Sequence, residues 1–143
     1  SGPLGSAAAC VRLKDLVPVD SHNLSPPQEA FYRPSARFDM RKYLETASSA
    51  IDISDGLVQD LNHILESSRC GASLESKLIP LGDSAELEDG LYGGDDYELI
   101  FTSPEDLGSF DKIGQLTKEP GIRVDGEAIR PRGFDHFLSQ PEP

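Results

Sequence analysis

The sequence has no tryptophan, one methionine and only two cysteines among its 143 residues. Cys10 and Cys70 lie far apart and neither is part of a CxxC pattern, so we expect neither a disulfide scaffold nor a cysteine-type zinc site. No apolar run approaches the ~20 residues that a membrane-spanning helix needs, and no signal-peptide pattern is visible. We therefore expect a cytoplasmic protein that is not inserted in a membrane.

Basic residues are also scarce. The chain has 13 Lys and Arg against 25 Asp and Glu, which gives a formal net charge of -12. A field of this sign repels phosphate backbones, so nucleic acid is not expected as the main partner. The same charge is compatible with divalent cations, or with a nucleotide whose phosphates are neutralised by a metal ion.

The chain is long enough for one ordinary domain. Its first six residues look like the remnant of a cleaved expression tag, and the adjacent Pro26 and Pro27 are typical of a linker. A short edge strand is expected at 11–19. We therefore predict a tag remnant and linker over residues 1–31, a compact domain over 32–138 and a tail over 139–143.

The hydrophobic pattern indicates a mixture of strands and helices without regular alternation. Strands are expected at 49–53, 72–76, 97–102, 112–117, 122–124 and 127–130, and helices at 37–47, 55–68 and 103–107. The 55–68 helix carries one apolar stripe, with Ser54 as the expected N-cap and Gly71 as the expected C-terminal glycine. The predicted fold class is α+β, with helices packed on one face of a mixed or mostly antiparallel sheet.

The first candidate site lies at the junction between the 49–53 strand and the 55–68 helix. Asp52 and Asp55 are three residues apart, with Ser54 and Gly56 beside them. Paired carboxylates form the all-oxygen environment that Mg²⁺ prefers, and a helix start can receive phosphate. On spacing alone, a capped helix with acids at its positive end is the more frequent explanation.

Two further segments could carry chemistry. Gly93 and Gly94 precede the adjacent acids Asp95 and Asp96, which suits a loop that approaches a cationic ligand or metal but also a solvated turn. The 131–137 segment includes Phe134 and could close a ligand pocket, although such segments are more often anchors on the core. The 86–89 acidic cluster is expected to be a solvated loop.

Taken together, these segments resemble thiamine-monophosphate kinase. The resemblance rests on Ala50–Leu57, on Tyr92–Thr102 and on Arg132–Phe137, with Arg33-Pro34 and Arg37 upstream. Three motifs occur in the order of the family and cover roughly residues 32–138. All of them belong to the C-terminal half of the family's chain.

The resemblance implies a domain like the C-terminal domain of aminoimidazole ribonucleotide synthetase. It also implies direct, Mg²⁺-assisted transfer of the γ-phosphoryl group of ATP to thiamine monophosphate, giving thiamine diphosphate. In that family Asp52 and Asp55 would be Mg²⁺ ligands and Ser54 would contact ATP. Asp95, where the family often has Glu, and Phe134 would contact the substrate.

The sequence also departs from the family. The N-terminal domain, which supplies most of the Mg²⁺-binding aspartates and the dimer interface of the homodimeric enzyme, has no counterpart, and the stretch from 80 to 91 is short. We therefore expect a fragment that is inactive alone. The alternative is a non-catalytic module of the same fold that binds a nucleotide or a thiamine phosphate.

Overall fold

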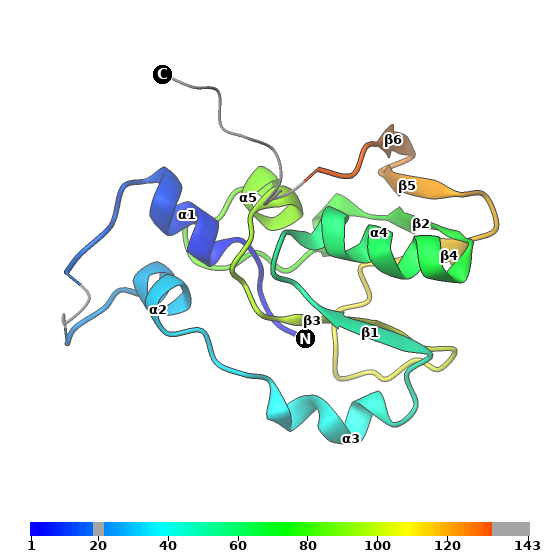
Figure 1. The fold of residues 1–143 in the computed structure, drawn as a ribbon, viewed down its shortest axis with the longest axis horizontal. Helices are drawn as coiled ribbons and strands as arrows, with labels where there is room; N and C mark the ends of the chain where they lie inside the picture. The colour runs from blue at the N-terminus through cyan, green and yellow to red at the C-terminus, as the bar shows by residue number, and fades with distance from the viewer. Residues whose placement is uncertain (19–21, 133–143) are drawn as a thin grey trace.

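The computed structural model describes residues 1–18 and 22–132, and within them six strands form two sheets (Figure 1). The strands are β1 (Ser49–Asp52), β2 (Gly71–Leu74), β3 (Leu99–Thr102), β4 (Gly114–Thr117), β5 (Gly121–Val124) and β6 (Glu127–Ile129). β1 pairs with β3, and the larger sheet has the order β4-β2-β5-β6. β2 and β5 are parallel and the other neighbours are antiparallel. The α+β prediction with a mixed sheet is confirmed.

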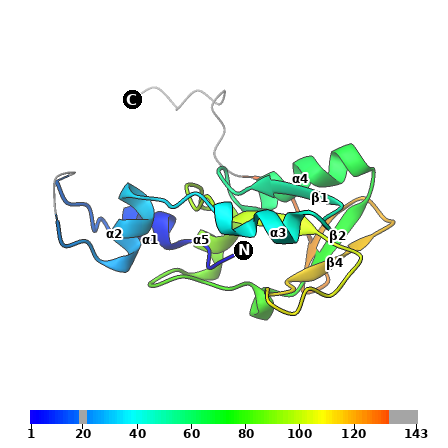
Figure 2. The same ribbon diagram turned by 90° about the horizontal axis from the view of Figure 1, so that it is seen from below.

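The helices cover different parts of these sheets. They are α1 (Ser6–Arg12), α2 (Pro26–Tyr32), α3 (Arg41–Leu44), α4 (Leu57–Ser68) and α5 (Leu87–Tyr92), with 3₁₀ turns at Phe38–Met40 and Ser76–Leu78. α4 lies across the four-stranded sheet in Figure 1, whereas α1, α2 and α5 gather at the other end of the molecule in Figure 2. None of the helices in the described ranges is long and apolar enough to cross a membrane.

The core lies between α4 and the four-stranded sheet. The apolar stripe of α4 is buried as its spacing predicted, and it packs against buried residues of β2 and β5. The residues concerned are Leu57, Val58, Leu61 and Leu65 of α4, Ala72 and Leu74 of β2, and Ile122 and Val124 of β5. Each large aliphatic side chain buried in this way contributes about 1.5–3 kcal/mol of transfer free energy.

Part of the N-terminal segment, over which a tag remnant and linker were expected, packs against the core. Leu4 is 3% exposed and belongs to the core, and Ala7, Ala9 and Cys10 of α1 are buried as well. The Leu4 N–H donates to the Pro80 carbonyl at 2.9 Å, and the Gly82 N–H donates to the Leu4 carbonyl at 2.9 Å. Small alanines carry little hydrophobic signal in a sequence, but they allow α1 to approach its neighbours closely.

Other local predictions were also wrong. Residues 11–18, the described part of the expected 11–19 strand, contain no strand. The 37–47 helix is reduced to a 3₁₀ turn and α3, and 103–107 is not helical. In the last case Ser103 Oγ accepts the Glu105 N–H at 3.1 Å, a local bond that competes with helix formation. Arg69, not Gly71, takes the left-handed conformation after α4, and Gly71 begins β2.

The acidic 86–89 stretch forms the start of α5 and is not a solvated loop. Glu86 and Asp89 form a capping box, and Asp89 is buried with an ion pair to Arg12 of α1 at 2.8 Å. Burial acts to raise the pKa of Asp89, but hydrogen bonds from Arg12 and from the Glu86 backbone outweigh it and lower that pKa. This pair ties α1 to α5.

Candidate functional site

The turn from Asp52 to Gly56 connects β1 to α4. Asp52 ends β1 with its side chain exposed, and α4 begins at Leu57 with Gly56 as its N-cap. Gly56 has a φ of 116°, and an added Cβ would lie 3.0 Å from the backbone of Tyr92. Only glycine fits this close approach without strain. The prediction that Ser54 caps the helix is therefore wrong, because the N-cap is Gly56, two residues later in the chain.

Asp60 of α4 holds the turn that precedes the helix. Its Oδ2 accepts the Ser54 N–H at 2.9 Å and the Asp55 N–H at 3.0 Å, while its side chain is buried. Burial raises the pKa of Asp60, although these two backbone hydrogen bonds oppose the rise. Asp60 was not among the predicted site residues, although an acid between Leu57 and Leu61 on the apolar face of α4 is a visible signal in the sequence.

The double-glycine loop runs antiparallel beside this turn. The Asp95 N–H donates to the Ser54 carbonyl at 2.9 Å, and the Tyr97 N–H donates to the Ile53 carbonyl at 2.8 Å. A Cβ on Gly94 would lie 2.4 Å from the Ser54 oxygen, so glycine is required for this contact. The structure thus brings the two motifs, about forty residues apart in sequence, into direct backbone contact.

Three carboxylates lie within electrostatic reach of Tyr97. The charge of Asp95 is the largest cause that raises the pKa of the Tyr97 phenol, and Asp52 and Asp55 add to it. The phenol donates a long hydrogen bond of 3.3 Å to Asp95 Oδ1. Asp95 and Tyr97 both have positive φ values, 65° and 53°, a conformation that is often found at functional sites.

These acids supply oxygen atoms of the kind that Mg²⁺ prefers, but not a complete set of ligands. Carboxylate oxygens suit Mg²⁺, which usually takes one or two carboxylates and fills its octahedron with water and phosphate oxygens. Among the described residues, however, no group of three or more His, Cys, Asp or Glu side chains could hold a metal ion. Asp52 and Asp55 therefore fit Mg²⁺ only if further ligands come from a phosphate, water or another protein segment.

Asp96, the second acid of the motif, contacts the N-terminal segment. Both of its carboxylate oxygens accept the Gly5 N–H, each at 2.9 Å, and with Glu98 and Ser6 it lines a cavity of about 740 Å³. Burial raises its pKa to about 7, helped by the charges of Glu98, Asp95 and Asp89 and opposed by the Gly5 hydrogen bond. The two adjacent acids of the motif thus have different surroundings, although the charge of Asp95 still raises the pKa of Asp96.

Asp96 predicts a pH dependence of stability. Because its pKa is about 7 in the folded state and 3.8 ordinarily, the folded chain retains a proton that the unfolded chain loses between these values. This group's contribution to stability is complete at low pH and declines as the pH rises through that window. Asp96→Asn keeps an acceptor for Gly5 and removes the charge, so we expect it to stabilise the chain at pH 8, by at most about 4 kcal/mol.

Urea unfolding of the native chain and of Asp96→Asn at several pH values measures this effect. The difference between their free energies of unfolding is expected to grow from pH 4 to pH 7 and then level off. Asp83→Asn is the control, because Asp83 is exposed on the surface. Parallel pH curves for the native chain and Asp96→Asn would contradict the assignment.

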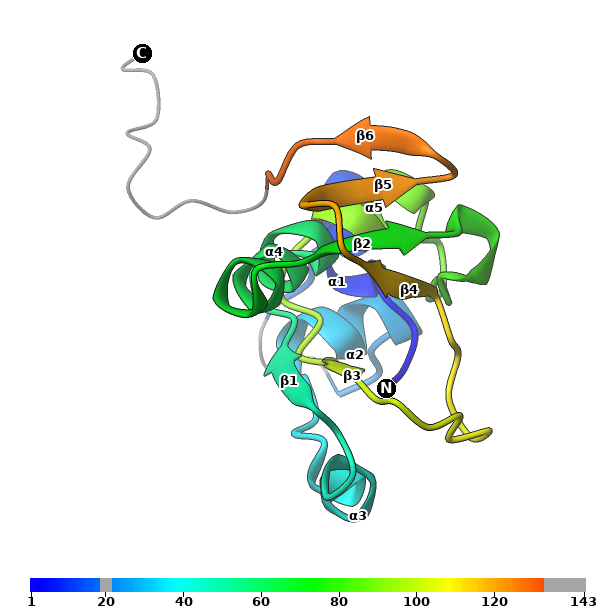
Figure 3. The same ribbon diagram turned by 90° about the vertical axis from the view of Figure 1, so that its right-hand side faces the viewer.

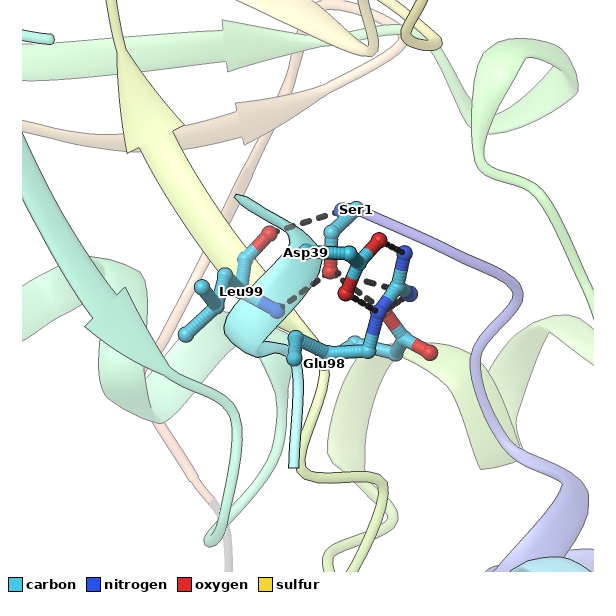
Figure 4. A network of polar contacts seen from close by, with 5 residues as sticks. Ser1, Asp39, Glu98 and Leu99 are labelled. Atoms are coloured by element: carbon cyan, nitrogen blue, oxygen red, sulfur yellow. Dashed lines mark hydrogen bonds and ion pairs between the residues drawn. The ribbon is translucent and has the colours of Figure 1, made fainter. Parts of the chain in front are cut away.

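Glu98 of the same motif is held by an ion pair with Arg37 (Figure 4). Arg37 also pairs with Asp39 at 3.0 Å, and the Ser1 hydroxyl donates to Glu98. The Ser1 amino group donates to the Leu99 carbonyl at 2.7 Å, and the Leu99 N–H donates to Ser1 Oγ at 2.7 Å. This network fixes the end of the motif where β3 begins.

Comparisons with known proteins agree with this arrangement, although no protein-family model matches the chain. A thiamine-monophosphate kinase of Aquifex aeolicus is 31% identical, and one of Escherichia coli strain K12 is 36% identical; each match covers 96% of this chain and 50% of the relative. A solved structure described as AaThiL complexed with AMPPCP and TMP has a TM-score of 0.82 at 31% identity, over 96% of this chain and 50% of that chain. The Stenotrophomonas maltophilia enzyme gives 0.79 at 28% identity, over 90% and 49%.

The chain is related to the C-terminal half of thiamine-monophosphate kinases. It spans about half the length of the curated relatives that it matches. A match over 96% of the chain has to include most of residues 1–31, which agrees with the packing of α1 against the core. The alignments extend over 156 and 164 positions, so these thiamine-monophosphate kinases carry insertions that the 143-residue chain lacks.

The third motif of thiamine-monophosphate kinases is described only at its beginning. Phe134, the predicted substrate contact, lies outside the described residues. Arg132 stacks over the Tyr92 ring, with its guanidinium carbon 3.9 Å from the ring centre, and pairs with Glu88. Both partners belong to α5, which leads into the double-glycine loop.

Proposed function

We propose that this chain is the C-terminal half of a kinase that transfers the γ-phosphoryl group of ATP to thiamine monophosphate. The observation that carries the proposal is the backbone contact between Ser54 and Asp95, which places the acids of both motifs on one surface. The relatives are thiamine-monophosphate kinases, and one related structure is complexed with AMPPCP and TMP. ATP and thiamine monophosphate are therefore the ligands we assign to the whole kinase.

In this proposal each residue has a distinct role. Asp52 and Asp55 bind Mg²⁺, which when bound neutralises the phosphate charges and orients the transferred group. Ser54 contacts ATP, and Asp60 holds the Ser54 and Asp55 amides so that the turn keeps one shape. Asp95 attracts the positive thiazolium of thiamine, and Phe134 provides an aromatic surface for it.

The isolated chain is proposed to bind rather than to catalyse. Its two aspartates supply only part of a Mg²⁺ coordination sphere, and phosphoryl transfer depends on complete charge neutralisation and positioning. Homodimerisation and a cytoplasmic location are proposed for the whole kinase, on the family resemblance alone.

Calorimetric titration of this chain with thiamine monophosphate, with and without Mg²⁺ and AMPPCP, tests the proposal. We expect saturable binding that Asp95→Ala weakens at least about tenfold, which corresponds to about 1.4 kcal/mol. Glu127→Ala on β6 removes an exposed acid of equal charge from another part of the molecule and should bind as the native chain does. Equal affinity of the native chain and Asp95→Ala would overturn the role of Asp95.

A further inference from the structure

The segment between Gly94 and β3 has an unusual backbone. Asp95 and Tyr97 both take the left-handed conformation, with φ values of 65° and 53°. This conformation is uncommon for residues other than glycine and rarest for bulky side chains, and it persists only where neighbouring contacts enforce it. Core packing does not account for a tyrosine here, because its side chain is 40% exposed. The position of Tyr97 therefore points to a use for its phenol.

Backbone hydrogen bonds hold the strained conformation in place. β1 and β3 lie side by side in Figure 3 and run antiparallel, so the segment that follows β1 meets the segment that precedes β3. The Tyr97 N–H donates to the Ile53 carbonyl at 2.8 Å, and the Asp95 N–H donates to the Ser54 carbonyl at 2.9 Å. Both left-handed residues are thus tied to the turn between β1 and α4.

The side chains of these two residues contact each other. The Tyr97 hydroxyl donates to Asp95 Oδ1 at 3.3 Å, and both residues are exposed, whereas Asp96 between them bonds to the N-terminal segment. The charge of Asp95 is the largest cause that raises the pKa of the Tyr97 phenol above its ordinary value of 10.0. The phenol therefore keeps its proton at neutral pH and remains a hydrogen-bond donor to the carboxylate.

We propose that Tyr97 is a positioning residue, whose hydroxyl group orients the Asp95 carboxylate for the positive ring of the substrate before the substrate binds. An exposed aspartate without such a partner samples several rotamers. Ordering the side chain in advance reduces the entropy that is lost on association. The part played by the substrate rests on the proposed function, whereas the contact between Tyr97 and Asp95 belongs to the ligand-free chain.

A neutral donor suits this position better than a charged side chain. A lysine or arginine at position 97 would neutralise the Asp95 charge that is meant for the substrate, and a carboxylate there would repel it. A phenol bonds to one oxygen of the carboxylate and leaves the other oxygen, together with the negative charge, available to a ligand. Tyr97→Phe removes only the hydroxyl group and keeps the ring, so it isolates this effect.

The ligand-free chain is tested first. Nuclear magnetic resonance measures the χ1 couplings of Asp95, which report whether its side chain occupies one rotamer or several. We expect one dominant rotamer in the native chain and averaging over several in Tyr97→Phe. Tyr43→Phe is the matched control, because it removes the same hydroxyl group from α3, where the ring packs edge-on against Phe110 with ring centres 4.6 Å apart. Asp95 couplings that are the same in the native chain and in Tyr97→Phe overturn the proposal.

A double-mutant cycle then tests the effect on binding. Thiamine monophosphate is titrated, with Mg²⁺ and AMPPCP, into the native protein, Tyr97→Phe, Asp95→Ala and the double variant, using the whole kinase if the separate chain does not bind. We expect Tyr97→Phe to weaken binding about threefold to tenfold in the native background, and less than about twofold where Asp95 is already alanine.

The cycle separates the two proposals. Equal losses from Tyr97→Phe in both backgrounds overturn the positioning role alone, because the hydroxyl group would then act on the substrate directly. Native affinity of Tyr97→Phe overturns it as well. Native affinity of Asp95→Ala overturns the proposed function of Asp95 and, with it, the role of Tyr97 in binding. A loss that depends on Asp95, together with averaged Asp95 couplings, supports the proposal.

Discussion

Leu65→Ala is expected to lower the free energy of unfolding by about 3–5 kcal/mol. Leu65 is 2% exposed and packs in the core between α4 and the sheet. Removing its isobutyl group loses transfer free energy and leaves a cavity that the surrounding strands close only in part. Leu61→Ala is expected to cost less, about 2–3 kcal/mol, because Leu61 already borders a cavity between β3 and β4.

Urea unfolding followed by circular dichroism measures both changes. His63→Ala is the control, because His63 lies on the exposed face of the same helix and should change the free energy of unfolding by less than about 0.5 kcal/mol. Equal losses for Leu65→Ala and His63→Ala would show that α4 buries a different face. A larger loss for Leu61→Ala than for Leu65→Ala would show that the cavity is filled in solution.

The elements that sequence predicted well carry strong local signals. The stripe on α4 has five apolar residues at helical spacing, and Asp125-Gly126 forms the turn between β5 and β6, with both residues at positive φ. Such signals lie within a few residues of one another, so neighbouring segments do not need to be known. The same holds for β1, whose predicted and observed bounds differ by one residue.

The elements that sequence missed depend on distant contacts. α1 is stabilised by the burial of alanines and by Arg12 pairing with Asp89, 77 residues away. The helix α5 was not predicted, because its acidic residues suggest a solvated loop when the sequence is considered alone. In the structure Glu86 and Asp89 pair with Arg12. At the candidate site, spacing alone favoured a helix cap at Ser54. The family resemblance linked the two motifs, and only the structure shows Asp60 supporting the turn.

If Asp52 has the role proposed above, Asp52→Asn is expected to reduce turnover of the whole kinase by about 100-fold or more, because losing one Mg²⁺ ligand weakens charge neutralisation by several kcal/mol. Asp52 is exposed at the end of β1, so the substitution should leave the melting temperature unchanged. Raising the Mg²⁺ concentration should recover part of the activity, because a weakened site still fills by mass action.

The experiment measures thiamine diphosphate formation over a range of Mg²⁺ concentrations in the native enzyme, Asp52→Asn and the surface variant Glu127→Gln. Only Asp52→Asn should shift the Mg²⁺ dependence to higher concentration. Asp60→Asn provides a second comparison, because it keeps one acceptor for the Ser54 and Asp55 amides but removes the charge of a buried side chain. Native turnover with native Mg²⁺ dependence in Asp52→Asn would exclude this residue as a metal ligand. The remaining explanation of the motif would then be that its acids only stabilise the start of the helix.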